Sequence, residues 1–175
     1  MPDLEFVFAV RDFVERGGDV LLVIAMVTMV MWTLIYERFW YFRRGHKREL
    51  DKALAQWEEW KRESSWEARQ VRRMLVSDVR LKLERGLPLI QTIVAVCPMF
   101  GLLGTVTGMI EVFDVMAVAG SGNARGMAAG VSKATLPTMA GMVAALSGML
   151  FSIQLRRFAQ RESERVADSL LIHEE

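Results

Sequence analysis

Residues 89–110 read LIQTIVAVCPMFGLLGTVTGMI, and none of these side chains carries a charge. A helix of about 22 residues rises about 33 Å, which matches the bilayer hydrocarbon core of about 30 Å. Two further windows, 20–36 and 134–155, also lack Asp, Glu, Lys and Arg. The 22 basic and 21 acidic side chains of this 175-residue chain therefore all lie outside the three windows. Because soluble helices mix charged and apolar positions, the pattern predicts an all-α integral membrane protein with three transmembrane helices.

Several function classes are disfavoured by composition. Cys97 is the one cysteine, which excludes a disulfide scaffold, and a net charge of +1 disfavours a nucleic-acid partner. His46 and His173 lie outside the windows, and no metal-ligand spacing occurs. The sequence has no phosphate-binding glycine loop after a strand and no Ser-His-Asp arrangement. We therefore expect no enzyme activity, no metal and no cofactor.

The charges between the windows predict the orientation. Residues 1–19 have a net charge of −3, and residues 37–88 have a net charge of +5. Four arginines follow the third window: Arg156, Arg157, Arg161 and Arg165. Basic residues mark the cytoplasmic side, so we expect an outside N-terminus, a cytoplasmic C-terminus and helices that extend into the cytoplasm.

The chain divides into seven expected segments. They are an outer amphipathic helix 1–19, a first transmembrane helix 20–42, a cytoplasmic helical segment 43–88, a second transmembrane helix 89–117, an outer loop 118–130, a third transmembrane helix 131–155 and a cytoplasmic tail helix 156–175. Gly17 and Gly18 allow the turn into the membrane. An aromatic belt ends the first span, at Trp32, Tyr36, Trp40 and Tyr41. The cytoplasmic segment contains an apolar stripe: Val71, Met74, Leu75, Val79 and Leu83.

Small residues line one face of the second and third spans. On the second span this face holds Cys97, Gly101, Gly104, Gly108 and Glu111. On the third it holds Ala134, Thr138, Gly141, Ala145, Gly148 and Ser152. Such faces allow close backbone approach, since lipid supplies no hydrophobic force between helices. Both spans therefore pack tightly against a neighbour that the sequence leaves open.

Hydroxyl groups follow the same two spans, at Thr92, Thr105, Thr107, Thr135, Thr138 and Ser147. Each can bond back to its own helix, which needs no function, or contribute to a polar seam. No charged residue lies in the middle of a span, so the chain lacks its own intramembrane proton carrier.

Two motifs in the second and third spans resemble those of a known family. Gly101-Leu-Leu-Gly-Thr-Val-Thr-Gly-Met-Ile110, followed by Phe113, resembles the second-span motif of the ExbB/TolQ/MotA proton-channel family. Leu136-Pro-Thr-Met-Ala-Gly-Met-Val-Ala-Ala-Leu146 resembles its third-span motif. Three spans with an outside N-terminus resemble the ExbB/TolQ layout, whereas MotA-type subunits have four spans.

The resemblance implies a function and partners. ExbB-like subunits form a ring, usually a homopentamer, in the inner membrane of Gram-negative bacteria. The ring encloses ExbD-like single-span subunits, uses the proton motive force and drives a TonB-like protein that opens outer-membrane receptors for import. Membrane lipid is the other expected partner, and the outer loop would then be periplasmic. A TolQ-like subunit of an envelope-integrity motor is one alternative, and a non-conducting membrane scaffold is the other.

The resemblance also assigns roles to residues. Thr105 and Thr138 match pore-lining threonines, and we place Thr135 and Ser132 on the same proton path. Six residues are assigned to helix packing, within the ring and around a central partner helix: Gly101, Gly104, Gly108, Pro137, Gly141 and Gly148. Glu111, Asp114 and Lys133 are candidates for the outer mouth. Lys133 stands where many ExbB proteins have glutamate, and a cation there would repel protons or pair with a carboxylate.

Overall fold

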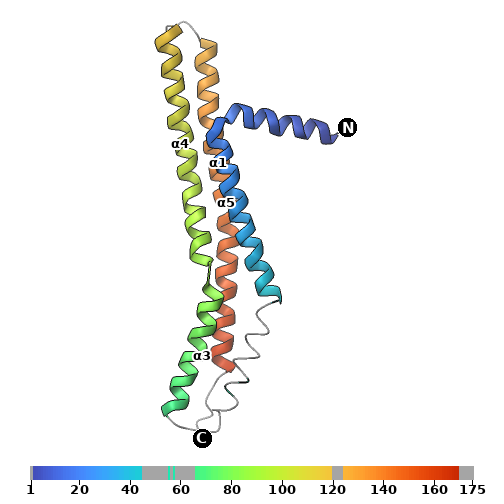
Figure 1. Ribbon diagram of the computed structural model, residues 1–175, viewed down its shortest axis with the longest axis vertical. Coiled ribbons are helices and arrows are strands. Elements are labelled where there is room, and N and C mark those ends of the chain that lie inside the picture. Colours follow the sequence, from blue (N-terminus) through green and yellow to red (C-terminus); the bar gives the residue numbers. More distant parts are fainter. Residues whose placement is uncertain (1, 45–54, 56, 58–65, 120–123, 170–175) are drawn as a thin grey trace. The chain divides into compact units, whose positions relative to one another are not determined.

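The computed structural model describes residues 2–44, 55, 57, 66–119 and 124–169, with the backbone alone at 2–16, 44, 68 and 119. These residues are helical apart from a short turn at 85–86 (Figure 1). The long helices are α1 (Pro2–Arg44), α3 (Trp66–Glu84), α4 (Leu87–Ala119) and α5 (Ala124–Ser169). The expected all-α fold is thus confirmed for the described part of the chain.

Three stretches are long and apolar enough to cross a membrane. They run over Gly17–Arg43, Arg69–Val118 and Ala124–Ser169, and each contains one of the charge-free windows. Large side chains such as Met26, Leu102 and Leu146 are more than half exposed along them. Exposed apolar side chains in charge-free helices are typical of surfaces that face lipid or another apolar helix.

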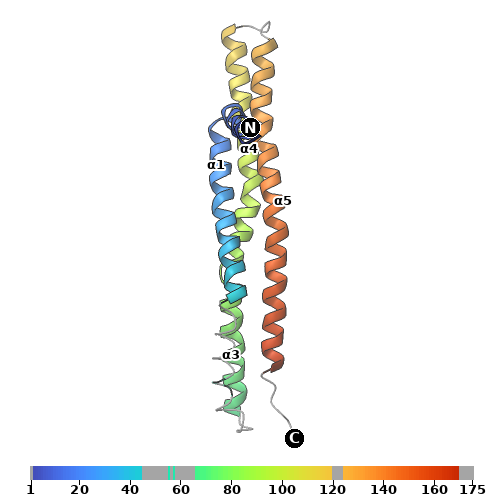
Figure 2. The ribbon, with the colours of Figure 1, turned by 90° about the vertical axis from the view of Figure 1, so that its right-hand side faces the viewer.

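The chain divides into two compact units. Unit 1 comprises Met1–Trp32 and Gln91–Met149, and within it α4 and α5 lie side by side (Figures 1 and 2). Gly18 interrupts the helical backbone of α1 with φ 66° and ψ −170°, a conformation that is essentially restricted to glycine. The first part of α1 therefore ends at the glycine pair where the sequence predicts a turn.

Unit 2 comprises Thr33–Ile90 and Leu150–Glu175. Its core is apolar: Leu75, Val79 and Leu83 of α3 are buried, as are Leu155, Ala159 and Val166 of α5. The Phe42 and Phe158 ring centroids are 5.0 Å apart. Met74 of the predicted stripe is instead 64% exposed, because the four-residue steps from Leu75 define the buried face and Met74 lies about 100° away from it.

The connection between α4 and α5 is shorter than the loop expected at 118–130. The helix α4 continues to Ala119 and α5 already begins at Ala124, so residues 124–130 are helical. This segment reads ARGMAAG, and its three alanines favour a helix. Parts of two other expected segments, 43–88 and 156–175, lie outside the described residues.

Candidate functional site

The site is built on close contact between the backbones of α4 and α5 in unit 1. A Cβ atom added at Gly141 would lie 2.7 Å from the carbonyl oxygen of Cys97 and 3.2 Å from the Cα atom of Gly101. A Cβ atom at Gly108 would lie 2.6 Å from the Cα atom of Ala134. No side chain fits at these distances, so glycine sets how closely the two helices approach.

Two further glycines of this face have partners in the same chain. Gly104 packs against the ring of Pro137, and Gly148 packs against Met31 of α1 and Val94 of α4. The small-residue faces of α4 and α5 therefore meet inside one chain. The expected contacts of these residues within a ring and around a central partner helix stay a prediction.

Thr138 is the hydroxyl residue that joins the two helices. Its Oγ1 donates to the Gly101 carbonyl oxygen at 2.9 Å, and the residue is half-buried. In an α-helix the same carbonyl also accepts the amide of the residue four positions later, which is Thr105. The carbonyl oxygen of Gly101 thus accepts from both threonines that the resemblance assigns to the path, from the Thr138 hydroxyl and from the Thr105 amide.

Four other hydroxyls bond within their own helices: Thr105, Thr107, Thr135 and Ser147. Thr105 Oγ1 donates to the Leu102 carbonyl at 2.6 Å. Thr135 Oγ1 donates to the carbonyl of Ser132 at 3.1 Å, and both of these residues are exposed. These are local bonds of the kind that needs no function. The structure brings Thr138 into contact with α4 and gives Thr135 and Ser132 local contacts.

The outer-mouth candidates Glu111 and Lys133 form an ion pair. Lys133 Nζ lies 2.7 Å from Glu111 Oε1 and 2.8 Å from Oε2. The side chains are 38% and 49% exposed for Lys133 and Glu111, respectively. The cation that departs from the family pattern is thus matched by a carboxylate of the neighbouring helix. Asp114 is exposed and does not line the cavity beside this pair.

A cavity of about 200 Å³ lies beside the pair in unit 1. Gly18 of α1, Thr107 and Gly108 of α4, and the Glu111–Lys133 pair line it. A Cβ atom at Gly18 would lie 2.8 Å from Lys133 Cε, so the lysine stem crosses the interrupted backbone of α1. Three helices therefore converge on this cavity.

Sequence reasoning missed the part that α1 takes in this site. The glycine pair was interpreted as a turn alone, and Asp19 and Thr107, which also line the cavity, were given no role. The available signal was the acidic Asp19 directly beside a glycine pair at the start of a charge-free window. Among the described residues, no group of three or more His, Cys, Asp or Glu side chains could hold a metal ion.

Comparisons with known proteins agree on one family. The profile of the MotA/TolQ/ExbB proton channel family matches residues 42–168. The biopolymer transport protein ExbB-like 1 of Synechocystis sp. is 29% identical over 168 residues, covering 77% of this chain and 66% of the relative. The biopolymer transport protein ExbB-like 3 of the same organism is 39% identical over 84 residues, covering 44% and 40%.

The chain thus spans a little less than two thirds of the first relative and two fifths of the second. No solved structure matches the chain.

Proposed function

The chain belongs to the MotA/TolQ/ExbB proton channel family as an ExbB-like member, and on this premise we propose that it is the channel-building subunit of a TonB-type energy-transducing complex. In this proposal it assembles as a ring, a homopentamer, in the inner membrane of a Gram-negative bacterium. An ExbD-like single-span subunit completes the path, and a TonB-like protein receives the mechanical output that drives outer-membrane import.

One observation carries the proposal: the windows of α4 and α5 hold hydroxyl groups and no carboxylate. An ionisable group within a membrane is costly, and where one occurs it usually marks a proton relay. A chain of a proton-channel family without such a group needs a carboxylate from a partner. This subunit then supplies the hydroxyl-lined wall, and the partner's span carries the proton.

The path begins in this proposal at the cavity beside Glu111 and Lys133. The ion pair closes the outer end of this path. Thr105 and Thr138 follow toward the membrane interior, where hydroxyls can bond water or the partner's carboxyl group. Gly104 and Gly108 let α5 pack closely against α4 along this path.

Proton flux into liposomes tests the proposal. The chain is reconstituted alone and together with the single-span protein that copurifies with it. We expect flux with the partner present, little flux without it, and none after the partner's intramembrane carboxylate is replaced by an amide. A complex that conducts no protons under any of these conditions would instead identify a scaffold. A TolA-like protein recovered in place of a TonB-like one would identify an envelope-integrity motor.

Replacement of Thr138 tests the proposed path. Thr138→Val removes the hydroxyl bond to Gly101, so we expect reduced flux and a loss of about 1 kcal/mol of stability. Thr138→Ser keeps the hydroxyl and should conduct. Thr135→Val is the matched structural control, because the Thr135 hydroxyl bonds only within α5, and we expect its stability to change by less than about 0.5 kcal/mol. Its flux tests the separate assignment of Thr135 to the path. Normal flux in Thr138→Val would remove Thr138 from the path.

A further inference from the structure

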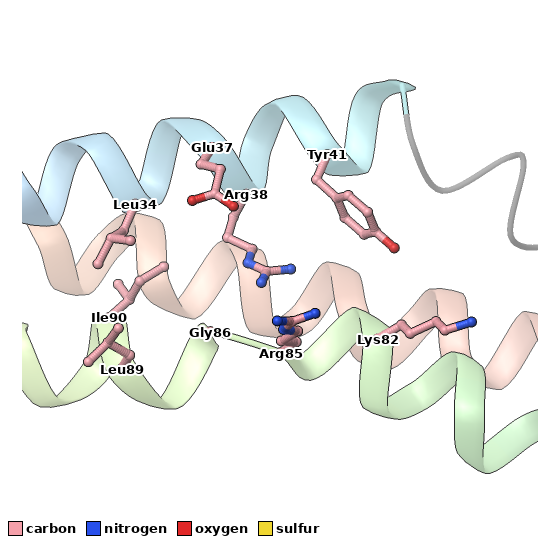
Figure 3. Close-up of a pocket in the computed structure, with 9 residues that line it drawn as sticks. All are labelled: Leu34, Glu37, Arg38, Tyr41, Lys82, Arg85, Gly86, Leu89 and Ile90. Carbon is pink, nitrogen blue, oxygen red and sulfur yellow. The ribbon is translucent and has the colours of Figure 1, made fainter.

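A second cavity, of about 520 Å³, lies in unit 2 between the last turns of α1 and the turn that joins α3 to α4 (Figure 3). Its size falls in the range of ligand sites, about 300–1,000 Å³. None of its lining residues belongs to the hydroxyl path, which lies in unit 1. A ligand in this cavity would therefore not occupy the proposed proton path.

The cavity has an apolar end and a charged end. Leu34 of α1 and Leu89 and Ile90 of α4 lie together at one end in Figure 3. Arg38, Lys82, Arg85 and Tyr41 occupy the middle and the other end. The apolar end adjoins the charge-free windows, and the charged end begins where those windows stop. The cavity thus crosses from the membrane interior to its basic boundary.

The charged end is strongly basic. Arg38, Lys82 and Arg85 line it with a single carboxylate, Glu37. Lys82 Nζ also lies 3.0 Å from Asp78 Oδ2, an exposed pair of the kind that contributes little to stability. The remaining positive charge attracts an anion.

The two arginines converge. In Figure 3 the guanidinium groups of Arg38 and Arg85 point toward one another from opposite sides of the cavity. Two like charges that face each other repel, whereas an anion between them makes charge-assisted hydrogen bonds to both. The planar donor forks of arginine match the oxygens of a phosphate group.

The absence of a side chain at Gly86 lets the Arg38 guanidinium lie close to the backbone. The φ of Gly86 is 78°, and a Cβ atom there would lie 2.9 Å from Arg38 Nε and 3.0 Å from Nη2. Arg38 also lies over the Tyr41 ring, with Cζ 5.6 Å from the centroid. The α4 helix begins directly afterward, where the Gly86 carbonyl accepts the Ile90 amide at 3.2 Å, so its positive dipole end also faces this region. The guanidinium of Arg38 thus lies between the Tyr41 ring and the Gly86 backbone, and the helix end adds positive potential for an anion.

We propose that this cavity binds the phosphate of an anionic phospholipid between Arg38 and Arg85, with the acyl chains leaving past Leu34, Leu89 and Ile90. Basic pockets between transmembrane helices on the cytoplasmic side are typical sites for anionic headgroups. Free phosphate has the same charged chemistry, but the apolar end favours a lipid. The inference requires only that these helices cross a membrane.

Native mass spectrometry of the purified full-length protein, with any copurifying subunit, tests the proposal. Phosphatidylglycerol is titrated against the protein in detergent, with phosphatidylcholine in a parallel arm. We expect at least about tenfold weaker phosphatidylglycerol retention in the double variant Arg38→Gln with Arg85→Gln. The matched control is Arg43→Gln with Arg73→Gln, which removes the same charge from exposed positions of α1 and α3 and should change retention less than about twofold.

Equal retention by the double variant and its control would overturn the proposal, as would equal retention of the two lipids by the unmodified protein. A third arm adds inorganic phosphate at millimolar concentration. Displacement of phosphatidylglycerol by inorganic phosphate would identify a soluble-phosphate site and overturn the lipid assignment. If the double variant aggregates on gel filtration, the single variants of Arg38 and Arg85, each compared with Arg43→Gln, give the same decision.

Discussion

At the scale of single residues, charged side chains are balanced differently in unit 1 and in unit 2. In unit 1 Lys133 is matched by Glu111, whereas in unit 2 Arg38, Lys82 and Arg85 line a cavity with a single carboxylate, Glu37. A cation paired with a carboxylate leaves no net charge for a ligand. Cations in excess of the carboxylates leave positive charge that can bind an anion. The same residue types therefore underlie the proposed gate in unit 1 and the proposed binding site in unit 2.

The Glu111–Lys133 pair yields a prediction at this scale. Glu111→Gln and Lys133→Gln each remove one partner, and the exchange Glu111→Lys with Lys133→Glu restores an opposite-charge pair. Because the pair is partly exposed, we expect a coupling energy of up to about 1 kcal/mol. Thermal unfolding in detergent measures it.

Asp114→Asn is the control for this pair, since it removes one charge from the same end of α4 without touching Lys133. A coupling energy of zero, with the charge exchange no more stable than the single variants, would show that the pair does not form. Higher proton flux in Lys133→Gln than in Asp114→Asn would support a gating role.

At the scale of the helices, the α4–α5 contact is the feature on which the path depends. Gly141→Ala places a methyl group 2.7 Å from the Cys97 carbonyl oxygen, and the opposing atom is backbone that cannot rotate away. We expect overpacking to cost about 1–3 kcal/mol and to displace Thr138 from Gly101. The measurement is the unfolding temperature in detergent together with proton flux.

Ala95→Val provides the comparison for Gly141→Ala, because it adds methyl groups to an exposed position of α4 and should be well tolerated. If Gly141→Ala and Ala95→Val unfold at the same temperature, the close contact does not limit the packing of these helices.

The helices themselves were predictable, and their contacts were not. Charge-free windows indicate spans because a single buried charge is costly in lipid, and this can be judged from local sequence. The bond from Thr138 to Gly101 joins residues 37 positions apart, so it depends on the relative rotation of two helices. Likewise, a helix face of small residues predicts close packing but does not identify the helix that packs against it. The position of Gly18 against Lys133 needed the path of α1 as well.

At the scale of the whole molecule, the orientation remains a prediction from the charge distribution. In a Cys97→Ser background, a cysteine replaces either Arg125, near the α4–α5 connection, or Arg161, near the end of α5. Both positions are exposed. A membrane-impermeant maleimide should label the first variant in cells whose outer membrane alone is permeabilised, and the second only after lysis.

The reverse labelling pattern would invert the orientation. Labelling of both variants in such cells would contradict a membrane crossing by α5 between these two positions. Cys97 itself is buried, and the serine background keeps it from contributing a signal.

The continuity of α5 has a mechanical consequence. This helix runs from Ala124 to Ser169 without a non-helical residue and contributes to both units. A helix of that length measures about 69 Å. Because helical hydrogen bonds resist twisting, the part of α5 that belongs to unit 1, residues 124–149, acts as one stiff shaft when a torque is applied near Thr138. Pro137, which removes one bond of the ladder beside Thr138, marks the point where that shaft is most compliant.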